Sequence, residues 1–167
     1  GTGRMPVDRV MKKMGVENIT VVKEQEMPDG NFPTCPYPNP EIREALQKGL
    51  ELLEETKGDI LIATDPDADR VGVAVKHKNE FRLITGNEMG VLMLDYICRA
   101  KNLNNTMPKN PVAVKTIVTT AMVDAVCNKY GVKLESVLTG FKFIGGVIAD
   151  LEENNRVEDY LLGFEES

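Results

Sequence analysis

Three aspartates, Asp65, Asp67 and Asp69, occupy alternate positions of one short segment, TDPDADR. Carboxylates spaced in this way on a tight loop repel one another, and a hard divalent cation satisfies all of them with oxygen ligands. Three acidic ligands also leave coordination positions open for water or a phosphate oxygen, which suits Mg²⁺. Arg70 follows at once, and its guanidinium could hold a phosphate beside the metal. The segment therefore predicts a divalent-metal site.

The run DILIAT, residues 59–64, leads directly into this acidic loop. A continuous apolar run is typical of a strand buried on both faces of a parallel sheet. Sheets of that kind bind ligands at the carboxyl ends of their strands, which is where the loop lies. A solvated acidic turn is the plain alternative. The complete DxDxDR pattern after an apolar strand favours a metal site more strongly than an isolated DxD pair does.

Other metal-binding loops fit the segment less well. An EF-hand loop needs Gly at its sixth position and Glu at its twelfth, where this chain has Arg70 and Lys76. A haloacid-dehalogenase-type phosphatase would use Asp65 as a nucleophile, but a third aspartate followed by arginine is not its usual pattern. The DxD of a glycosyltransferase is a further alternative, although nothing else in the chain indicates a nucleotide-sugar site.

The elements that must position this loop form the first half of the chain. The pattern predicts a helix over residues 6–14, a strand over 17–22, a proline-rich loop over 28–40, a helix capped by Asn39 and ended by Gly58, the strand 59–64, and a hairpin of VGVAV with FRLI. The first module is expected to end near Ile84.

A new alternation of helices and strands begins at Thr85. It predicts helices over 88–101, 121–130 and 142–153, and strands over 112–118, 132–138 and 159–164. Such alternation is typical of layered α/β folds. We therefore expect two consecutive three-layer-like α/β modules with mainly parallel mixed sheets, residues 1–84 and 85–167.

Composition limits the class of protein. The 167 residues are 42% hydrophobic and 28% charged, with a net charge of −6, which argues against a nucleic-acid surface. The longest apolar runs are too short to span a bilayer, and no signal peptide opens the chain, so we expect a cytoplasmic protein without a membrane partner. Cys35, Cys98 and Cys127 follow no metal-binding or disulfide pattern and are interpreted as free thiols.

Several segments together resemble the α-D-phosphohexomutase superfamily, the phosphoglucomutases and phosphomannomutases. ATDPDADR is similar to the metal loop of that family, GTGRMP to a strand-to-helix turn of its second domain, and NFPTCPYPNPE to the proline-rich segment before the metal loop. ITGNEMGVLML resembles the start of the third domain, and LTGFKFIG and GFEES resemble its two substrate-contacting loops. The resemblance covers nearly the whole chain.

The resemblance implies roles for individual residues. The three aspartates would bind Mg²⁺, and Arg70 would contact the phosphoryl group in flight. Lys142 would reach the substrate or its phosphate and assist proton transfer, while Glu165 and Ser167 would hydrogen-bond sugar hydroxyls. Phe164 departs from the pattern, because relatives have Gly before the paired glutamates.

The resemblance also implies a reaction. A phosphoserine donates its phosphoryl group to a hexose phosphate, and the resulting bisphosphate reorients and returns the other phosphate, with hexose 1,6-bisphosphate as activator.

Ser136 and Ser167 are the only serines and neither is in a Ser-His-Asn-Pro setting, and the sole histidine is His77. Both ends of the chain look cut. We therefore expect a piece of a mutase that lacks domains 1 and 4, binds metal weakly and is inactive alone. A stand-alone module that binds metal or sugar phosphate is the alternative.

Overall fold

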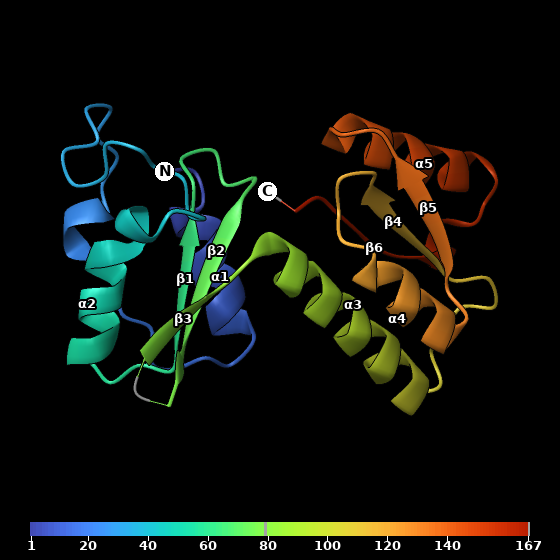
Figure 1. Cartoon of the computed structure of the whole chain (residues 1–167), viewed down its shortest axis with the longest axis horizontal. Helices are drawn as coiled ribbons and strands as arrows, with labels where there is room; N and C mark the ends of the chain where they lie inside the picture. The colour runs from blue at the N-terminus through green and yellow to red at the C-terminus, as the bar shows by residue number, and fades with distance from the viewer. Residues whose placement is uncertain (79, 167) are drawn as a thin grey trace. The chain divides into compact units, whose positions relative to one another are not determined.

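The computed structural model describes residues 1–78 and 80–166. The chain divides into two compact units, Gly1–Thr85 and Gly86–Ser167, each with its own sheet (Figure 1). The two units are described in turn.

The first unit is built around a three-stranded antiparallel sheet in the order β1-β2-β3. Its elements are α1 (Arg4–Lys13), the 3₁₀ turns η1 (Lys23–Gln25) and η2 (Arg43–Leu46), α2 (Gln47–Glu55), β1 (Ile60–Thr64), β2 (Val71–His77) and β3 (Glu80–Ile84). The predicted hairpin of β2 with β3 is confirmed. The predicted parallel sheet is wrong for this unit, because residues 65–70 between β1 and β2 are too few for a parallel crossover, which needs roughly a dozen.

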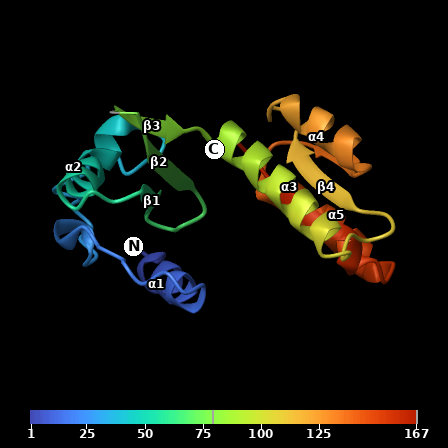
Figure 2. The ribbon, with the colours of Figure 1, turned by 90° about the horizontal axis from the view of Figure 1, so that it is seen from below.

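One face of this sheet carries the core of the unit. Leu46 and Leu50 pack with Ala74 of β2, and Leu61 and Ala63 of β1 join them. Figure 2 shows α1 and α2 on different sides of the three strands. On the other face of β1, Ile60 and Ile62 are 48% and 37% exposed. The expectation that β1 is buried on both faces is therefore wrong in the described part of the chain, since alternate side chains of a strand point to opposite faces.

Two local expectations for this unit are also corrected. Residues 17–22 form no strand, because they pair with no ladder among the described residues. The second helix begins later than Pro40. The side-chain oxygen of Asn39 accepts a hydrogen bond from the N–H of Glu41 at 3.0 Å, which closes an Asx turn instead of capping a helix. The helical path starts only at Arg43.

The second unit is a parallel sheet in the order β5-β4-β6 between helices. Its elements are α3 (Gly86–Leu103), β4 (Val112–Thr116), α4 (Met122–Tyr130), β5 (Lys133–Val137), α5 (Phe141–Glu153), the 3₁₀ turn η3 (Val157–Asp159) and β6 (Tyr160–Phe164). The predicted alternation is confirmed, with boundaries that shift by one or two residues.

The central strand β4 is buried along its whole length and separates two apolar layers. Ala113 faces the layer formed by α3 and α4, whereas Val112 and Val114 face α5. Figure 1 shows α3 and α4 below this sheet and α5 above it. The second unit is therefore the expected three-layer α/β/α arrangement. Its parallel strands bring the segments after β4, β5 and β6 to one edge of the sheet.

Candidate functional site

The acidic loop forms the connection between β1 and β2, at the carboxyl end of β1. One carboxylate oxygen from each of the three aspartates lies within 4.8 Å of those of the other two. The loop turns sharply at Ala68, whose φ of 65° is left-handed, and the backbone N–H of Ala68 donates to the carbonyl of Asp65 at 3.2 Å. The hairpin thus brings together carboxylates that the sequence places at alternate positions.

Asp65 is the buried member of the group, with a side chain that is 0% exposed. The backbone N–H of Arg70 donates to its Oδ1 at 3.1 Å, and the Nε–H of Arg70 donates to its Oδ2 at 2.9 Å. Burial, the largest single influence, favours the neutral acid, but hydrogen bonds from Arg70 first and then with Asp67 and Asp69 together outweigh it and hold the pKa of Asp65 below its usual range. Asp65 is therefore ionised at neutral pH despite its burial.

Asp67 and Asp69 complete the group from the solvent side, where both are exposed. The pKa of Asp69 is raised, first by its hydrogen bond with Asp65, then by burial and by the negative charges of Asp67 and Asp65. The negative charges of the neighbouring carboxylates thus oppose the ionisation of Asp69. A divalent cation bound by the three carboxylates would neutralise this repulsion. The residues present therefore fit the metal predicted from the sequence.

Arg70 has a defined structural partner. Its guanidinium binds Asp65 and lies 3.9 Å from Asp69, while 38% of its side chain stays exposed. The predicted contact of Arg70 with a phosphoryl group stays a prediction, and the partial exposure of the side chain leaves room for it.

In the second unit, two predicted substrate loops meet at the carboxyl edge of the sheet. The side-chain oxygen Oε1 of Glu165 accepts a hydrogen bond from the backbone N–H of Gly140 at 3.1 Å. Gly140 has a φ of 121°, which glycine adopts readily, and it precedes α5 directly. Lys142 lies in the first turn of α5 with its Nζ 4.9 Å from the ring centre of Phe143. Ser167, the remaining predicted sugar contact, lies outside the described residues.

Both units match profiles of one protein family. A profile described as "Phosphoglucomutase/phosphomannomutase, alpha/beta/alpha domain II" matches residues 1–78, and the corresponding profile for domain III matches residues 85–167. The chain belongs to the phosphoglucomutase/phosphomannomutase family. The resemblance deduced from the loop sequences is confirmed.

Relatives of the chain within this family match it end to end. It is 36% identical over 167 residues to a phosphomannomutase of Mycoplasmoides pirum, and 37% identical over 171 residues to a phosphoglucomutase of Staphylococcus saprophyticus. It is 38% identical over 174 residues to the human glucose 1,6-bisphosphate synthase. All of the chain is covered in each case, but only 29%, 30% and 27% of the relative. The chain therefore spans less than a third of the length of these relatives.

Solved structures agree with the fold. The crystal structure of a putative phosphomannomutase from Thermus thermophilus matches 94% of this chain with a TM-score of 0.66 at 24% identity, and covers 32% of that chain. An X-ray structure of a phosphoglucomutase/phosphomannomutase family protein from Burkholderia thailandensis matches 95% of this chain with a TM-score of 0.67 at 23% identity, and covers 30% of that chain.

Phe164, the departure from the family pattern, has a structural explanation. It is 7% exposed and belongs to the apolar layer under α3 and α4. Its ring lies against Gly90 of α3, where any Cβ would overlap it. The glycine on the helix therefore supplies the space that the aromatic ring of Phe164 needs.

Lys115 is a buried cation that the sequence reasoning did not single out. It is 8% exposed near the carboxyl end of β4, and its Nζ donates to Asp124 at 2.6 Å and to the carbonyl of Thr120 at 3.3 Å. Its position inside the apolar run VAVKTIV could have indicated a buried, paired lysine. An interior position in a buried strand obliges a charged side chain to find a partner.

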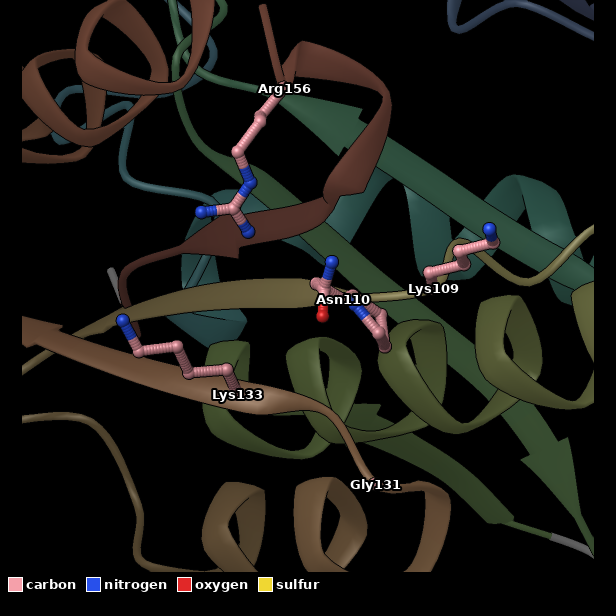
Figure 3. A pocket seen from close by; sticks show the side chains of 6 residues that line it. Lys109, Asn110, Gly131, Lys133 and Arg156 are labelled. Atoms are coloured by element: carbon pink, nitrogen blue, oxygen red, sulfur yellow. The ribbon is translucent and has the colours of Figure 1, made fainter. Parts of the chain in front are cut away.

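Three cationic side chains lie at the amino edge of the parallel sheet, opposite the edge that carries the predicted substrate loops (Figure 3). Lys109, Lys133 and Arg156 line a hollow of about 470 Å³. Lys133 is paired with Glu135 at 2.6 Å, and Arg156 with Asp159 at 2.8 Å. Because two of these three cations are already compensated, the loops at the carboxyl edge remain the better candidate site in this unit.

In the described part of the chain, no helix combines the length and the apolar character needed to cross a bilayer.

Proposed function

We propose that this chain forms the metal-binding and sugar-binding parts of a phosphosugar mutase that interconverts hexose 1-phosphate and hexose 6-phosphate. The convergence of Asp65, Asp67 and Asp69 beside Arg70, in a chain of this family, is the observation that carries the proposal. Residues 1–84 are assigned to the second domain of the parent protein and residues 85–167 to the third.

The first unit would hold Mg²⁺ through the three aspartates. Bound there, the cation would withdraw charge from the oxygens of a phosphoryl group during its transfer. Arg70 has two tasks in this scheme. It keeps Asp65 ionised through the hydrogen bonds described above, and its guanidinium, on a side chain that is 38% exposed, would bind phosphoryl oxygens that the carboxylates repel.

The second unit would bind the sugar. Glu165 carries acceptor oxygens suited to sugar hydroxyls, and Gly140 fixes its side chain at the start of α5. Lys142 projects from the first turn of that helix and has no ion pair among the described residues, so it would bind a phosphate or transfer a proton. Ser167 is proposed as a second hydroxyl contact on the basis of the family resemblance.

The phosphoserine and the remaining phosphate contacts are assigned to parts of the parent polypeptide outside this chain. The serine would donate its phosphoryl group to one sugar hydroxyl and regain the other phosphate from the bisphosphate after reorientation. Hexose 1,6-bisphosphate would then serve as activator, and the phosphorylated sugar is the expected partner of the site.

The parent protein provides the test of this activity. With Mg²⁺ and glucose 1,6-bisphosphate it should convert glucose 1-phosphate or mannose 1-phosphate into the 6-phosphate, and Asp67→Asn should slow the reaction at least about a hundredfold. Failure of the wild-type parent protein to convert any hexose phosphate would overturn the proposal. The 167-residue chain alone should form no product, and turnover by it would contradict the assignment of the serine to another segment.

The other readings of the acidic loop are not favoured. A haloacid-dehalogenase-type phosphatase would need Asp65 free as a nucleophile, whereas Arg70 binds both of its oxygens. A stand-alone binding module is not favoured because the relatives that match the whole chain are three times its length or more.

A further inference from the structure

The loop after β6 contains a second glutamate, Glu166, to which neither the sequence nor the proposed function gives a role. Its Oε2 accepts a hydrogen bond from the hydroxyl of Thr119 at 3.2 Å. Thr119 is only 5% exposed and lies 2.9 Å, oxygen to oxygen, from the fully buried hydroxyl of Thr116. Because the proton of Thr119 is directed to Glu166, Thr116 donates to Thr119. A buried hydroxyl chain thus runs from the end of β4 to Glu166.

The backbone of Glu166 is held as well. It passes over the first residue of α3, Gly86, where a Cβ would overlap the carbonyl oxygen of Glu166. The next residue of α3, Asn87, accepts a hydrogen bond from the N–H of Thr120 at 2.8 Å. The first turn of α3 therefore lies against the backbone of Glu166 and binds the backbone of Thr120, the neighbour of Thr119.

Glu165 and Glu166 are attached to different elements. Glu166 is joined to the loop after β4, whereas Glu165 reaches Gly140 in the loop after β5. The two glutamates are consecutive residues, so these two hydrogen bonds hold the same short stretch of backbone at two points. Loss of the Thr119 hydrogen bond would release one of these two points and loosen the contact between Glu165 and Gly140.

We propose that Glu166 is a positioning residue, anchored by Thr119, that holds Glu165 at the start of α5 for sugar binding. The sugar-binding consequence rests on the proposed function, but the anchoring itself does not. In this arrangement Glu165 binds the sugar, and Glu166 holds the backbone of the loop after β6 in place.

The anchoring is tested on the chain itself by amide hydrogen exchange. Thr119→Val removes the donor and keeps the shape of the side chain, so the N–H of Gly140 should exchange about tenfold faster, since Glu165 protects it less often. Thr106→Val serves as a control in the same unit, because the hydroxyl of Thr106 donates to the nearby carbonyl of Lys101. Unchanged protection of Gly140 in Thr119→Val, with folding intact, would overturn the proposal.

The consequence for sugar binding is tested in the full-length parent protein. Thr119→Val and Glu166→Ala should each raise KM for the hexose phosphate about tenfold and leave kcat within about twofold, because ground-state contacts are misplaced. Glu166→Gln keeps an acceptor oxygen for Thr119 and should stay close to wild type. The double variant Thr119→Val/Glu166→Ala should be no worse than either single one, since both remove the same contact.

The outcomes separate the two proposals. Additive losses in the double variant, or a collapse of kcat in Glu166→Ala alone, would mean that Glu166 touches the substrate and would overturn the positioning role. If the wild-type parent protein converts no hexose phosphate, the proposed function fails, and the exchange of the Gly140 amide still decides the anchoring.

Discussion

The guanidinium Nε of Arg70 lies 2.9 Å from the buried carboxylate of Asp65. This pair offsets part of the repulsion among the three converging carboxylates. Arg70 neutralises the charge of Asp65, so the remaining repulsion is mainly between the exposed carboxylates of Asp67 and Asp69. The hairpin and Arg70 therefore hold the three carboxylates of the acidic loop close together.

Removal of the guanidinium of Arg70 should destabilise the first unit. In Arg70→Gln, the buried carboxylate of Asp65 loses its counter-charge, and we expect unfolding to become easier by about 1–3 kcal/mol. Millimolar Mg²⁺ should restore part of the loss, since a cation supplies the missing charge. Urea unfolding followed through the NMR signals of β1 and β2 measures the effect. Arg43→Gln, at an exposed arginine, is the control, and equal stability of the two variants would contradict the prediction.

Metal binding should depend on Asp67. Titration of the chain with Mn²⁺ or Mg²⁺ should detect weak binding, and Asp67→Asn should lower the affinity about tenfold or more because a charged ligand is lost. Asp59→Asn is a matched control, since it removes a charge at the other end of β1. Equal affinity in wild type and Asp67→Asn would refute the assignment of the loop.

The space beside Phe164 should be sensitive to a single methyl group. Gly90→Ala should destabilise the second unit by about 1–3 kcal/mol, because its Cβ overlaps the ring. Adding Phe164→Leu should relieve much of that cost. Gly145→Ala in α5, where a Cβ meets open space, should instead stabilise by about 0.5–1 kcal/mol. Thermal or urea unfolding of the four proteins gives the signs, and a neutral Gly90→Ala would disprove the tight contact.

The three free thiols should react in a defined order. Burial raises the pKa of Cys127 to about 11, with further contributions from Cys98 and Asp124, and burial also raises the pKa of Cys98. At pH 8 only about one Cys127 in a thousand is then a thiolate, and that fraction rises tenfold per pH unit.

Iodoacetamide labelling read by mass spectrometry measures this order. The half-buried Cys35 should be modified first. Cys98 and Cys127 should react appreciably only in denaturant, because their side chains are buried. Equal rates for Cys35 and Cys127 in the native chain would contradict the burial described here.

Local patterns predicted much of the second unit because each of its elements carries its own signal. The helix 142–153 and the strand 159–164 were recognisable from periodicity and flanking residues, and they differ from the structure by one residue at one end. The acidic loop was also recognisable, since three alternating carboxylates after an apolar strand are a short-range feature. The predicted roles of its residues stay predictions.

Only the tertiary structure decided the direction of the first sheet and the partners of distant side chains. DILIAT reads equally well as a parallel or an antiparallel strand, because the choice depends on where the chain returns and not on the strand itself. The Thr119–Glu166 hydrogen bond joins residues 47 positions apart, and the burial of Lys115 follows from helices packed on both faces of β4. The sequence by itself determined which carboxylates the acidic loop carries and the family to which the chain belongs. The packing of elements distant in the chain determined which side chains are held in place, because such contacts exist only when the layers have assembled.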